Sequence, residues 1–315
     1  MTEAGIPVVD IGPFRRGEAA GAREVVDTIR RACEEIGFFT ITGHGVPDEL
    51  VDRMYHTSRA FFDLAAERKA RVGQTGDVQG GLMYFPMMAE SLAASLGEQR
   101  PGDLKESLDY GPGFMGDEWP AEPAGLQDVW VEYYRAMSEL SASLRRIFAL
   151  AIGLPEDWFE DKFDRHHSSL RVINYPDPQG DLLPGQLRAG AHSDYGFLTI
   201  LRSEDSTGGL QVRNRDGEWA DVPTVEGAFI VNIGDAMMRW TNDRWVSTVH
   251  RVVNPPDHGR ANSRRQSIPF FHNPNADAVI ECFEAFRDAD NPPKYHPVTY
   301  GEYADLKYRQ THGAT

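Results

Sequence analysis

Two residues suited to binding a metal ion stand two positions apart past the middle of the chain. His192 and Asp194 occur in the run AHSDYGFLTIL, whose later part has the β-branched and aromatic content of a strand. Side chains at positions i and i+2 of a strand project from the same face, so this imidazole and this carboxylate can converge on one point. A turn or a hydrogen bond between the two side chains explains the same pair, so the pair alone does not predict a metal site.

His250 is a third candidate ligand. It lies in the β-rich run STVHRVV and projects to the opposite face from Val249 and Arg251. If this strand neighbours that of His192, two imidazoles and one carboxylate meet and leave three coordination positions open. That ligand set is typical of non-haem Fe(II) oxygenases, in which a cosubstrate and O₂ use the open positions.

Arg265 and Ser267 form a second pair with strand spacing, in the run RRQSIPFF. A guanidinium and a hydroxyl on one face of a strand make a suitable receptor for a carboxylate. The alternative is an exposed strand face with an arginine at the surface, a role that Arg264 could also fill. The apolar residues that follow favour a half-buried strand, in which Arg265 needs an anionic partner such as a small-molecule carboxylate.

The elements that must position these residues change in type along the chain. Helical spacing of apolar residues predicts helices over 21–36, about 47–65 and about 125–152, and a further helix closes the chain at 299–310. From about residue 168, short β-rich runs recur without helices between them. These runs cover residues 170–175, 197–201, 208–213, 218–222, 228–233, 247–253 and 266–271. Strands at this density indicate an antiparallel sandwich or barrel.

Residues 73–119 are rich in Gly, Met and Pro and show little periodicity. The segment is too long for a plain connector, so it is either disordered or a functional loop. Met83, Tyr84 and Phe85 are poor choices for a solvated linker, which favours a loop at the mouth of a binding site. The alternative is that these side chains cap the core.

Acidic residues outnumber basic ones by 48 to 32, a formal net charge of −16. This balance argues against nucleic acid or an anionic membrane surface as the main partner. No apolar run is long enough for a membrane span, and no signal peptide is visible at the N-terminus. Two cysteines, Cys33 and Cys282, are too few for a disulfide framework and fit buried thiols in a reducing compartment. We therefore expect a cytoplasmic protein, and we expect it to be a monomer.

The candidate site residues, taken in sequence order, resemble the motifs of the isopenicillin N synthase-like family of Fe(II)- and 2-oxoglutarate-dependent oxygenases. The motifs are His192-x-Asp194, His250 and Arg265-x-Ser267. Five further stretches also resemble that family. They are GFFTITGHGVP (37–47), DLKESLDYG (103–111), INYPDP (173–178), GGLQV (208–212) and NIGDAMMRWTNDRWVSTVHRV (232–252). The likeness extends from about residue 6 to about residue 310.

The resemblance implies one oxygenase domain over 1–315, mainly β with flanking helices, whose core is a distorted double-stranded β-helix, or jelly roll. Within it we expect a largely helical part over 1–167, with a substrate-mouth loop at about 73–119. The jelly-roll core with the iron site would cover 168–298, and a C-terminal helix 299–315.

The same resemblance implies a role for each motif residue. His192, Asp194 and His250 would hold Fe(II), while Arg265 and Ser267 would bind the distal carboxylate of the cosubstrate 2-oxoglutarate. The implied reaction uses O₂ to oxidise a C–H bond of a small molecule by hydroxylation, desaturation or cyclisation, and it releases succinate and CO₂. We expect such a reaction in secondary metabolism, for example in antibiotic biosynthesis.

Other site residues are inferred with less support from the residues themselves. Asn174 and Tyr175 match an Asn-Tyr pair of the family whose tyrosine contacts 2-oxoglutarate; a core aromatic is the alternative for Tyr175. Candidate substrate contacts, for which packing or surface exposure is the alternative, are Tyr84, Phe85, Arg100, Lys105, Phe271 and His272. Four histidines are not expected to bind the metal, namely His44, His166, His167 and His258.

Three other functions remain open from the residues alone. An iron oxidase of the isopenicillin N synthase or ACC oxidase type would use O₂ without 2-oxoglutarate, and Arg265 and Ser267 would then hold the substrate's own carboxylate. A hydrolase would use Zn²⁺ at the same ligands to activate water, but no general base is placed by a motif. A non-catalytic binding protein could also use a jelly roll, because a fold does not determine a function.

Overall fold

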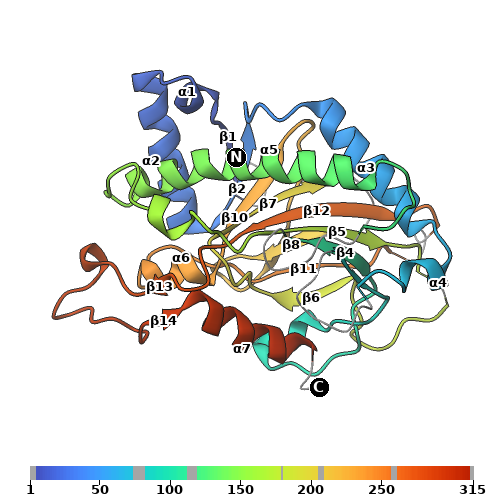
Figure 1. Cartoon of the computed structure of the whole chain (residues 1–315). Helices are drawn as coiled ribbons and strands as arrows, with labels where there is room; N and C mark the ends of the chain where they lie inside the picture. Colours follow the sequence, from blue (N-terminus) through green and yellow to red (C-terminus); the bar gives the residue numbers. More distant parts are fainter. Residues whose placement is uncertain are drawn as a thin grey trace.

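The computed structural model of the chain describes residues 5–73, 82–111, 119–178, 180–204, 209–256 and 261–312. Two β-sheets face each other, and helices cover the outer face of the larger one (Figure 1). The larger sheet has the strand order β1 (Val8–Asp10), β2 (Phe38–Thr42), β10 (Phe229–Ile233), β7 (Leu198–Ser203), β12 (Arg265–His272), β5 (Ser169–Tyr175), β4 (Glu106–Tyr110) and β3 (Leu82–Phe85). The smaller sheet has the order β6 (Ala189–His192), β11 (His250–Val252), β8 (Leu210–Arg213) and β9 (Trp219–Asp221). This arrangement confirms the predicted jelly roll.

The helices lie on two sides of these sheets. In Figure 1 the long helix α5 (Leu126–Ala151) crosses above the larger sheet, while α7 (Tyr300–His312) lies below β6 on the opposite side. The remaining helices are α1 (Gly12–Arg15), α2 (Ala19–Glu35), α3 (Asp48–Phe62), α4 (Ala66–Lys69), α6 (Asp235–Trp240) and the 3₁₀ turns η1 (Leu92–Leu96), η2 (Glu160–Lys162) and η4 (Glu284–Phe286). A short separate ribbon pairs β13 (Val279–Ile280) with β14 (Val298–Thr299).

Helix α5 shows why the predicted helices form where they do. Val129, Tyr133, Met137 and Leu140 recur at helical spacing and are all buried against the larger sheet and helices α2 and α3. The helix ends before Gly153, which adopts a left-handed φ of 78° that a side chain would disfavour. The predicted helices over 21–36, 47–65 and 299–310 are likewise confirmed, with small shifts at their ends.

The two faces of the larger sheet bury two different sets of side chains. On β5, Leu170 and Val172 pack into the main hydrophobic core beneath the helices. Ile173 and Tyr175 join a second cluster that lies between the two sheets. Because strand residues alternate in direction, every strand of this sheet has one helix-facing and one barrel-facing set. The barrel interior between the sheets is where the candidate site lies.

The segment 73–119 is not the irregular loop that its composition suggests. Its described part contains β3, η1 and β4, and both strands extend the larger sheet beyond β5. All five residues of β4 (ESLDY) are buried, although Glu106 and Asp109 are of types that are uncommon in strands, so the composition of this short segment does not indicate a strand. The described part of the first 167 residues thus contributes four strands to the larger sheet, although this region was expected to be largely helical.

Cys33 and Cys282 are both buried and not joined in a disulfide, as expected for two isolated thiols. None of the helices in the described ranges combines the length and the apolar character that crossing a membrane requires.

Candidate metal centre

His192, Asp194 and His250 converge between the two sheets. His192 ends β6 and His250 begins β11, and these residues are direct partners in the antiparallel pairing of the two strands. Asp194 Oδ1 lies 3.9 Å from His192 Nε2 and 3.7 Å from His250 Nε2, and the three ligand atoms all lie within 4.8 Å of one another. Donor atoms about 2.1 Å from one ion are at most about 4.2 Å apart, so both carboxylate–imidazole distances suit a shared metal. The predicted convergence of the three side chains is therefore observed.

Backbone carbonyls orient both imidazoles. His192 Nδ1 lies 2.8 Å from the carbonyl oxygen of Gly190, and His250 Nδ1 lies 3.1 Å from that of Thr248. A carbonyl only accepts hydrogen bonds, so Nδ1 carries the proton in each neutral ring. The lone pair is then on Nε2, the atom that faces Asp194, which is the tautomer that a metal requires.

Two neighbouring side chains hold the Asp194 carboxylate. Its Oδ2 accepts hydrogen bonds from Thr199 Oγ1 at 2.6 Å and from Asn232 Nδ2 at 2.7 Å. Oδ1 is thereby directed to the two imidazoles. Sequence reasoning missed both donors, although Asn232 is a single amide within the buried apolar strand β10 and could have been noticed on that ground.

The protonation states of the group also suit a cation. Burial, and then the neighbouring His250, lower the pKa of His192 to about 3, so this ring is neutral at pH 7. Burial alone would raise the pKa of Asp194, but His250, His192 and the bonds from Asn232 and Thr199 hold it below its usual value. A neutral imidazole and an ionised carboxylate are the forms that bind metal without first losing a proton.

Thr199 and Asn232 provide a test of this arrangement. We expect Thr199→Val or Asn232→Leu to weaken Fe(II) binding about 10- to 100-fold, because the carboxylate loses a donor that fixes its orientation. Thr199→Ser keeps the hydroxyl and serves as the matched control. Anaerobic Fe(II) titration measures the affinity, and native affinity in Thr199→Val would show that the hydrogen bond does not position Asp194.

Arg265, Ser267 and Tyr175 lie together in the barrel interior. Arg265 and Tyr175 are register partners on β12 and β5, and the guanidinium carbon lies 5.3 Å from the centre of the tyrosine ring. Arg265 Nη2 donates to Ser203 Oγ and, at 3.1 Å, to Ser267 Oγ. Arg265 Nε and Nη1 are buried without a hydrogen-bond partner, and Arg265 forms no ion pair within the described part of the chain. A buried guanidinium with two open donors fits a bound carboxylate, such as the distal one of 2-oxoglutarate.

Asn174 faces away from this group, which corrects its assignment to the cosubstrate. Its side chain donates to Glu106 Oε1 at 2.8 Å and accepts from Arg264 Nε at 3.0 Å. The reason is alternation along β5: Tyr175 points into the barrel, so Asn174 points to the helix side. Its amide is already bonded at both ends there.

Three substrate candidates also lie away from the barrel interior. Tyr84 packs on the helix side, where its hydroxyl donates to Glu106 at 2.5 Å. His272 is fully buried in the main core between Arg145 and Ser168, at 2.9 Å from each. Arg100 is exposed, and its Nε donates to Glu98 at 2.8 Å. Tyr84 and His272 project from the helix-facing side of their strands, so these two residues are corrected to packing roles. Arg100 is a surface residue, and its role as a substrate contact stays a prediction.

Phe85, Lys105 and Phe271 remain as candidates on the barrel side. Phe271 is the register partner of Thr199, the residue that donates to Asp194. Phe85 is the register partner of Ser107, which in turn pairs with the barrel-facing Ile173. Lys105 is 4% exposed and forms an ion pair of 2.7 Å with Glu90.

The other described histidines are not part of the metal group. His44 Nε2 lies 2.7 Å from the carbonyl oxygen of Gly227, and His166 stacks on Tyr134. His167 lies outside the group as well, and His258 is outside the described residues.

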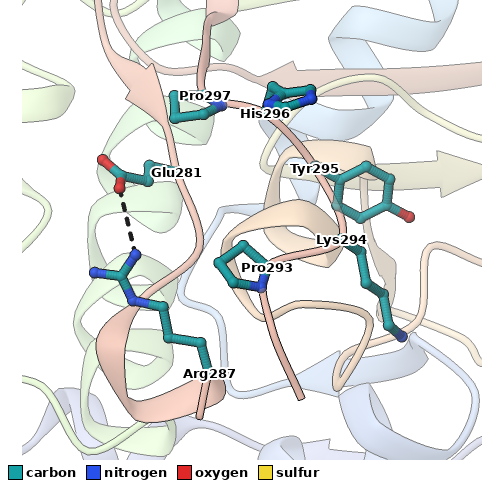
Figure 2. Close-up of a pocket in the computed structure, with 7 residues that line it drawn as sticks. All are labelled: Glu281, Arg287, Pro293, Lys294, Tyr295, His296 and Pro297. Carbon is teal, nitrogen blue, oxygen red and sulfur yellow. Dashed lines mark ion pairs between the residues drawn. The ribbon is translucent and has the colours of Figure 1, made fainter. Parts of the chain in front are cut away.

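A cavity of about 250 Å³ on the C-terminal side does not belong to this centre. Figure 2 shows that its lining comes from one stretch, residues 281–297, and that Glu281 and Arg287 form an ion pair there. The two charged groups of this pair are 3.6 Å apart. Its lining includes no residue of the metal group.

A jelly roll that brings two imidazoles and a carboxylate together beside a buried arginine defines a non-haem iron oxygenase. The family model of the 2OG-Fe(II) oxygenase superfamily matches residues 167–274, and that of the N-terminal region of non-haem dioxygenases in morphine synthesis matches residues 6–133. The 2-oxoglutarate-Fe(II) type oxidoreductase hxnY of Emericella nidulans is 32% identical, over 99% of this chain and 92% of the relative. Homoarginine-6-hydroxylase 2-ODD-C23 of Glycine max is 31% identical, over 95% of this chain and 94% of the relative.

Solved structures agree with these matches. The crystal structure of a full-length Neurospora crassa protein in complex with alpha-KG and thymine superimposes with a TM-score of 0.85 at 30% identity, over 98% of each chain. The chain therefore belongs to the 2-oxoglutarate-Fe(II) oxygenase superfamily. It is a dioxygenase that depends on Fe(II), 2-oxoglutarate and O₂. The hydrolase and the non-catalytic binding protein are thereby set aside, and so is the oxidase that needs no 2-oxoglutarate.

Proposed function

We propose that this dioxygenase oxidises a C–H bond of a small polar molecule, with Fe(II) held by His192, Asp194 and His250. Arg265 and Ser267 anchor the distal carboxylate of 2-oxoglutarate beside Tyr175. The observation that carries the proposal is the buried convergence of the three ligand atoms next to an arginine with two open donors. When bound, Fe(II), 2-oxoglutarate and O₂ supply the oxidising chemistry, with succinate and CO₂ as by-products.

The residues of the chain bind and orient the reactants. Thr199 and Asn232 keep the Asp194 carboxylate ionised and oriented towards the two imidazoles. The three metal ligands are therefore in position before the metal binds. Arg265 binds the distal carboxylate of 2-oxoglutarate. The opposite end of the cosubstrate is thereby held in position to reach the metal. The aromatic residues of the interior, among them Phe38 at 5.4 Å from the ring of His250, exclude water from the metal.

A charged and aromatic cluster beside the metal centre supports a polar substrate. The Arg171 guanidinium lies 5.5 Å from the ring centre of Phe85 and 5.9 Å from that of Phe271. It also donates to Asp109 at 2.6 Å and to Glu90 at 3.1 Å. A molecule next to Phe271 therefore meets an aromatic ring together with a buried guanidinium and two carboxylates. These groups suit a ligand with hydrogen-bond donors and acceptors, such as a heterocycle, an amide or an amino acid.

Relatives act on, or bind, molecules of this kind. One is named a homoarginine hydroxylase, and another is a structure with thymine bound. The proposal is tested by incubating the purified enzyme with Fe(II), 2-oxoglutarate, O₂ and a panel of such molecules. Succinate formed in proportion to an oxidised product supports it, and isotopically labelled O₂ separates hydroxylation from desaturation or cyclisation. Turnover of the true substrate without 2-oxoglutarate would contradict it.

The adjacent residues Phe271 and His272 give a paired prediction. We expect Phe271→Ala to lower kcat/KM for the substrate about 10- to 100-fold with little change in the 2-oxoglutarate KM, because the ring lines the space beside the metal. We expect His272→Ala to leave that ratio nearly unchanged but to destabilise the fold by about 2–3 kcal/mol, since Arg145 Nη1 and Ser168 Oγ each lose a buried hydrogen bond and the ring leaves a cavity. Steady-state kinetics and thermal unfolding separate the two, and the reverse pattern would contradict the assignment of faces.

The proposal also covers the domain organisation, oligomeric state, location and pathway of the enzyme. We infer a single oxygenase domain and a monomer in the cytoplasm, acting in secondary metabolism such as antibiotic biosynthesis, with no nucleic-acid partner. The net charge of −16 and the continuous larger sheet, which joins strands of both halves of the chain, support this picture. Sedimentation analysis tests the oligomeric state, and metabolite changes in a deletion strain test the pathway.

A further inference from the structure

A second guanidinium is buried near the candidate cosubstrate residues, and no sequence motif indicated it. Arg188 directly precedes β6, four positions before His192, and its side chain is fully buried. Its Nη2 donates to the carbonyl oxygen of Ser263 at 2.6 Å and to Ser263 Oγ at 3.0 Å. Burying a charged side chain of this size is costly unless hydrogen bonds and a nearby negative charge offset the lost solvation.

Arg188 and Arg265 lie against the same aromatic ring. The guanidinium carbon of Arg188 is 5.9 Å from the ring centre of Tyr175, and that of Arg265 is 5.3 Å from it. Burial, and then the charge of Arg265, lower the pKa of Arg188 to about 10, which still leaves it charged at pH 7. Two like charges in a low-dielectric interior repel each other, and an anion bound near both would relieve this repulsion.

The open donors of Arg265, which lie near Tyr175, suit a carboxylate. Within the described ranges, Arg265 Nε and Nη1 have no hydrogen-bond partner, and the two oxygens of a carboxylate offer about four acceptor positions. One carboxylate can therefore accept from Arg265 and still be attracted by a second guanidinium. We propose that Arg188 is a second cationic residue of the cosubstrate site, and that with Arg265 it selects a 2-oxo acid that carries a distal carboxylate. This inference rests on the proposed role of Arg265.

The test measures cosubstrate binding without turnover. Anaerobic titration of the Fe(II) enzyme with 2-oxoglutarate, followed by its visible charge-transfer absorption, gives a Kd for each variant. We expect Arg188→Gln to raise this Kd about 10- to 100-fold, as for loss of one charged contact, with unchanged Fe(II) affinity. Arg188→Lys keeps the charge and should raise the Kd less than Arg188→Gln. 2-Oxopentanoate lacks the distal carboxylate. The preference for 2-oxoglutarate over 2-oxopentanoate should therefore fall in Arg188→Gln, which removes the charge, and stay close to native in Arg188→Lys, which keeps it.

Arg202→Gln is the matched control. Arg202 lies on β7 with its guanidinium over Phe229, on the helix side, and it donates to the carbonyl oxygen of Ala228. We expect its replacement to leave the 2-oxoglutarate Kd unchanged. A merely structural role for Arg188 would lower the melting temperature without changing the preference between the two oxo acids.

The outcomes separate this inference from the proposed function. If Arg265→Gln weakens 2-oxoglutarate binding and folded Arg188→Gln does not, Arg188 has no part in the site and only this inference fails. If neither variant changes the Kd, the proposed cosubstrate site itself is wrong. If Arg188→Gln does not fold, Arg188→Met, which also removes the charge but keeps an apolar side chain of similar length, decides: an unchanged Kd and an unchanged preference overturn the inference.

Discussion

His250→Ala is expected to abolish stoichiometric Fe(II) binding and to lower kcat/KM at least about 1000-fold, a loss of about 4 kcal/mol in transition-state stabilisation. The structure gives the reason. His250 is the only one of the three ligands that comes from β11, and without it the remaining imidazole and carboxylate come from one short segment. Two ligands cannot hold the metal at the face where the cosubstrate must bind. Metal analysis of anaerobically purified protein and O₂ uptake measure the effect.

His56→Ala is the control for this variant. His56 is exposed on α3, and its Nδ1 lies 2.8 Å from the carbonyl oxygen of Asp52, away from the metal group. We expect native iron content and activity. Added imidazole that partly restores iron to His250→Ala would support the ligand role further. Full iron content and turnover in His250→Ala would show that the metal is bound elsewhere.

Arg265→Gln is expected to raise the 2-oxoglutarate KM about 100- to 1000-fold, while the enzyme still binds one equivalent of Fe(II). Removing one partner of a buried charge pair costs about 3–4 kcal/mol, because the carboxylate of the cosubstrate is left in the barrel without its counter-charge. Arg265 is 3% exposed, so solvent cannot replace the guanidinium. Succinate formation at increasing 2-oxoglutarate concentrations measures the change.

The conservative change Ser267→Ala gives a graded comparison with Arg265→Gln. Ser267 Oγ accepts from Arg265 at 3.1 Å, so its loss should shift the 2-oxoglutarate KM by only about 3- to 10-fold, as for one hydrogen bond with the charged guanidinium left in place. A KM in Arg265→Gln within about threefold of the native value would contradict the anchoring role. Arg265 would then serve the packing of Tyr175 instead.

Spacing along the strands, together with the resemblance to a known family, identified much of the centre. Two-residue periodicity placed His192 with Asp194 and Arg265 with Ser267. Arg265 and Ser267 share a face of β12, whereas Asp194 lies beyond the end of β6 and still converges with His192. Strands with several β-branched residues were predicted at nearly the observed positions, because local propensity and turn residues act over a few residues. Strand β4 was missed because it is short and contains Glu106 and Asp109, which are of types uncommon in strands.

Tertiary structure decided which face of each strand lies inside the barrel. Tyr175 and Phe271 project between the sheets, whereas their neighbours Asn174 and His272 project towards the helices. Periodicity states that adjacent residues point apart, but the choice of the inner face depends on which sheet packs against which side. The donors to Asp194, and the approach of Arg188 to Tyr175, depend on strands and loops that are distant in sequence. Such contacts have no local signal, so only the folded chain reveals them.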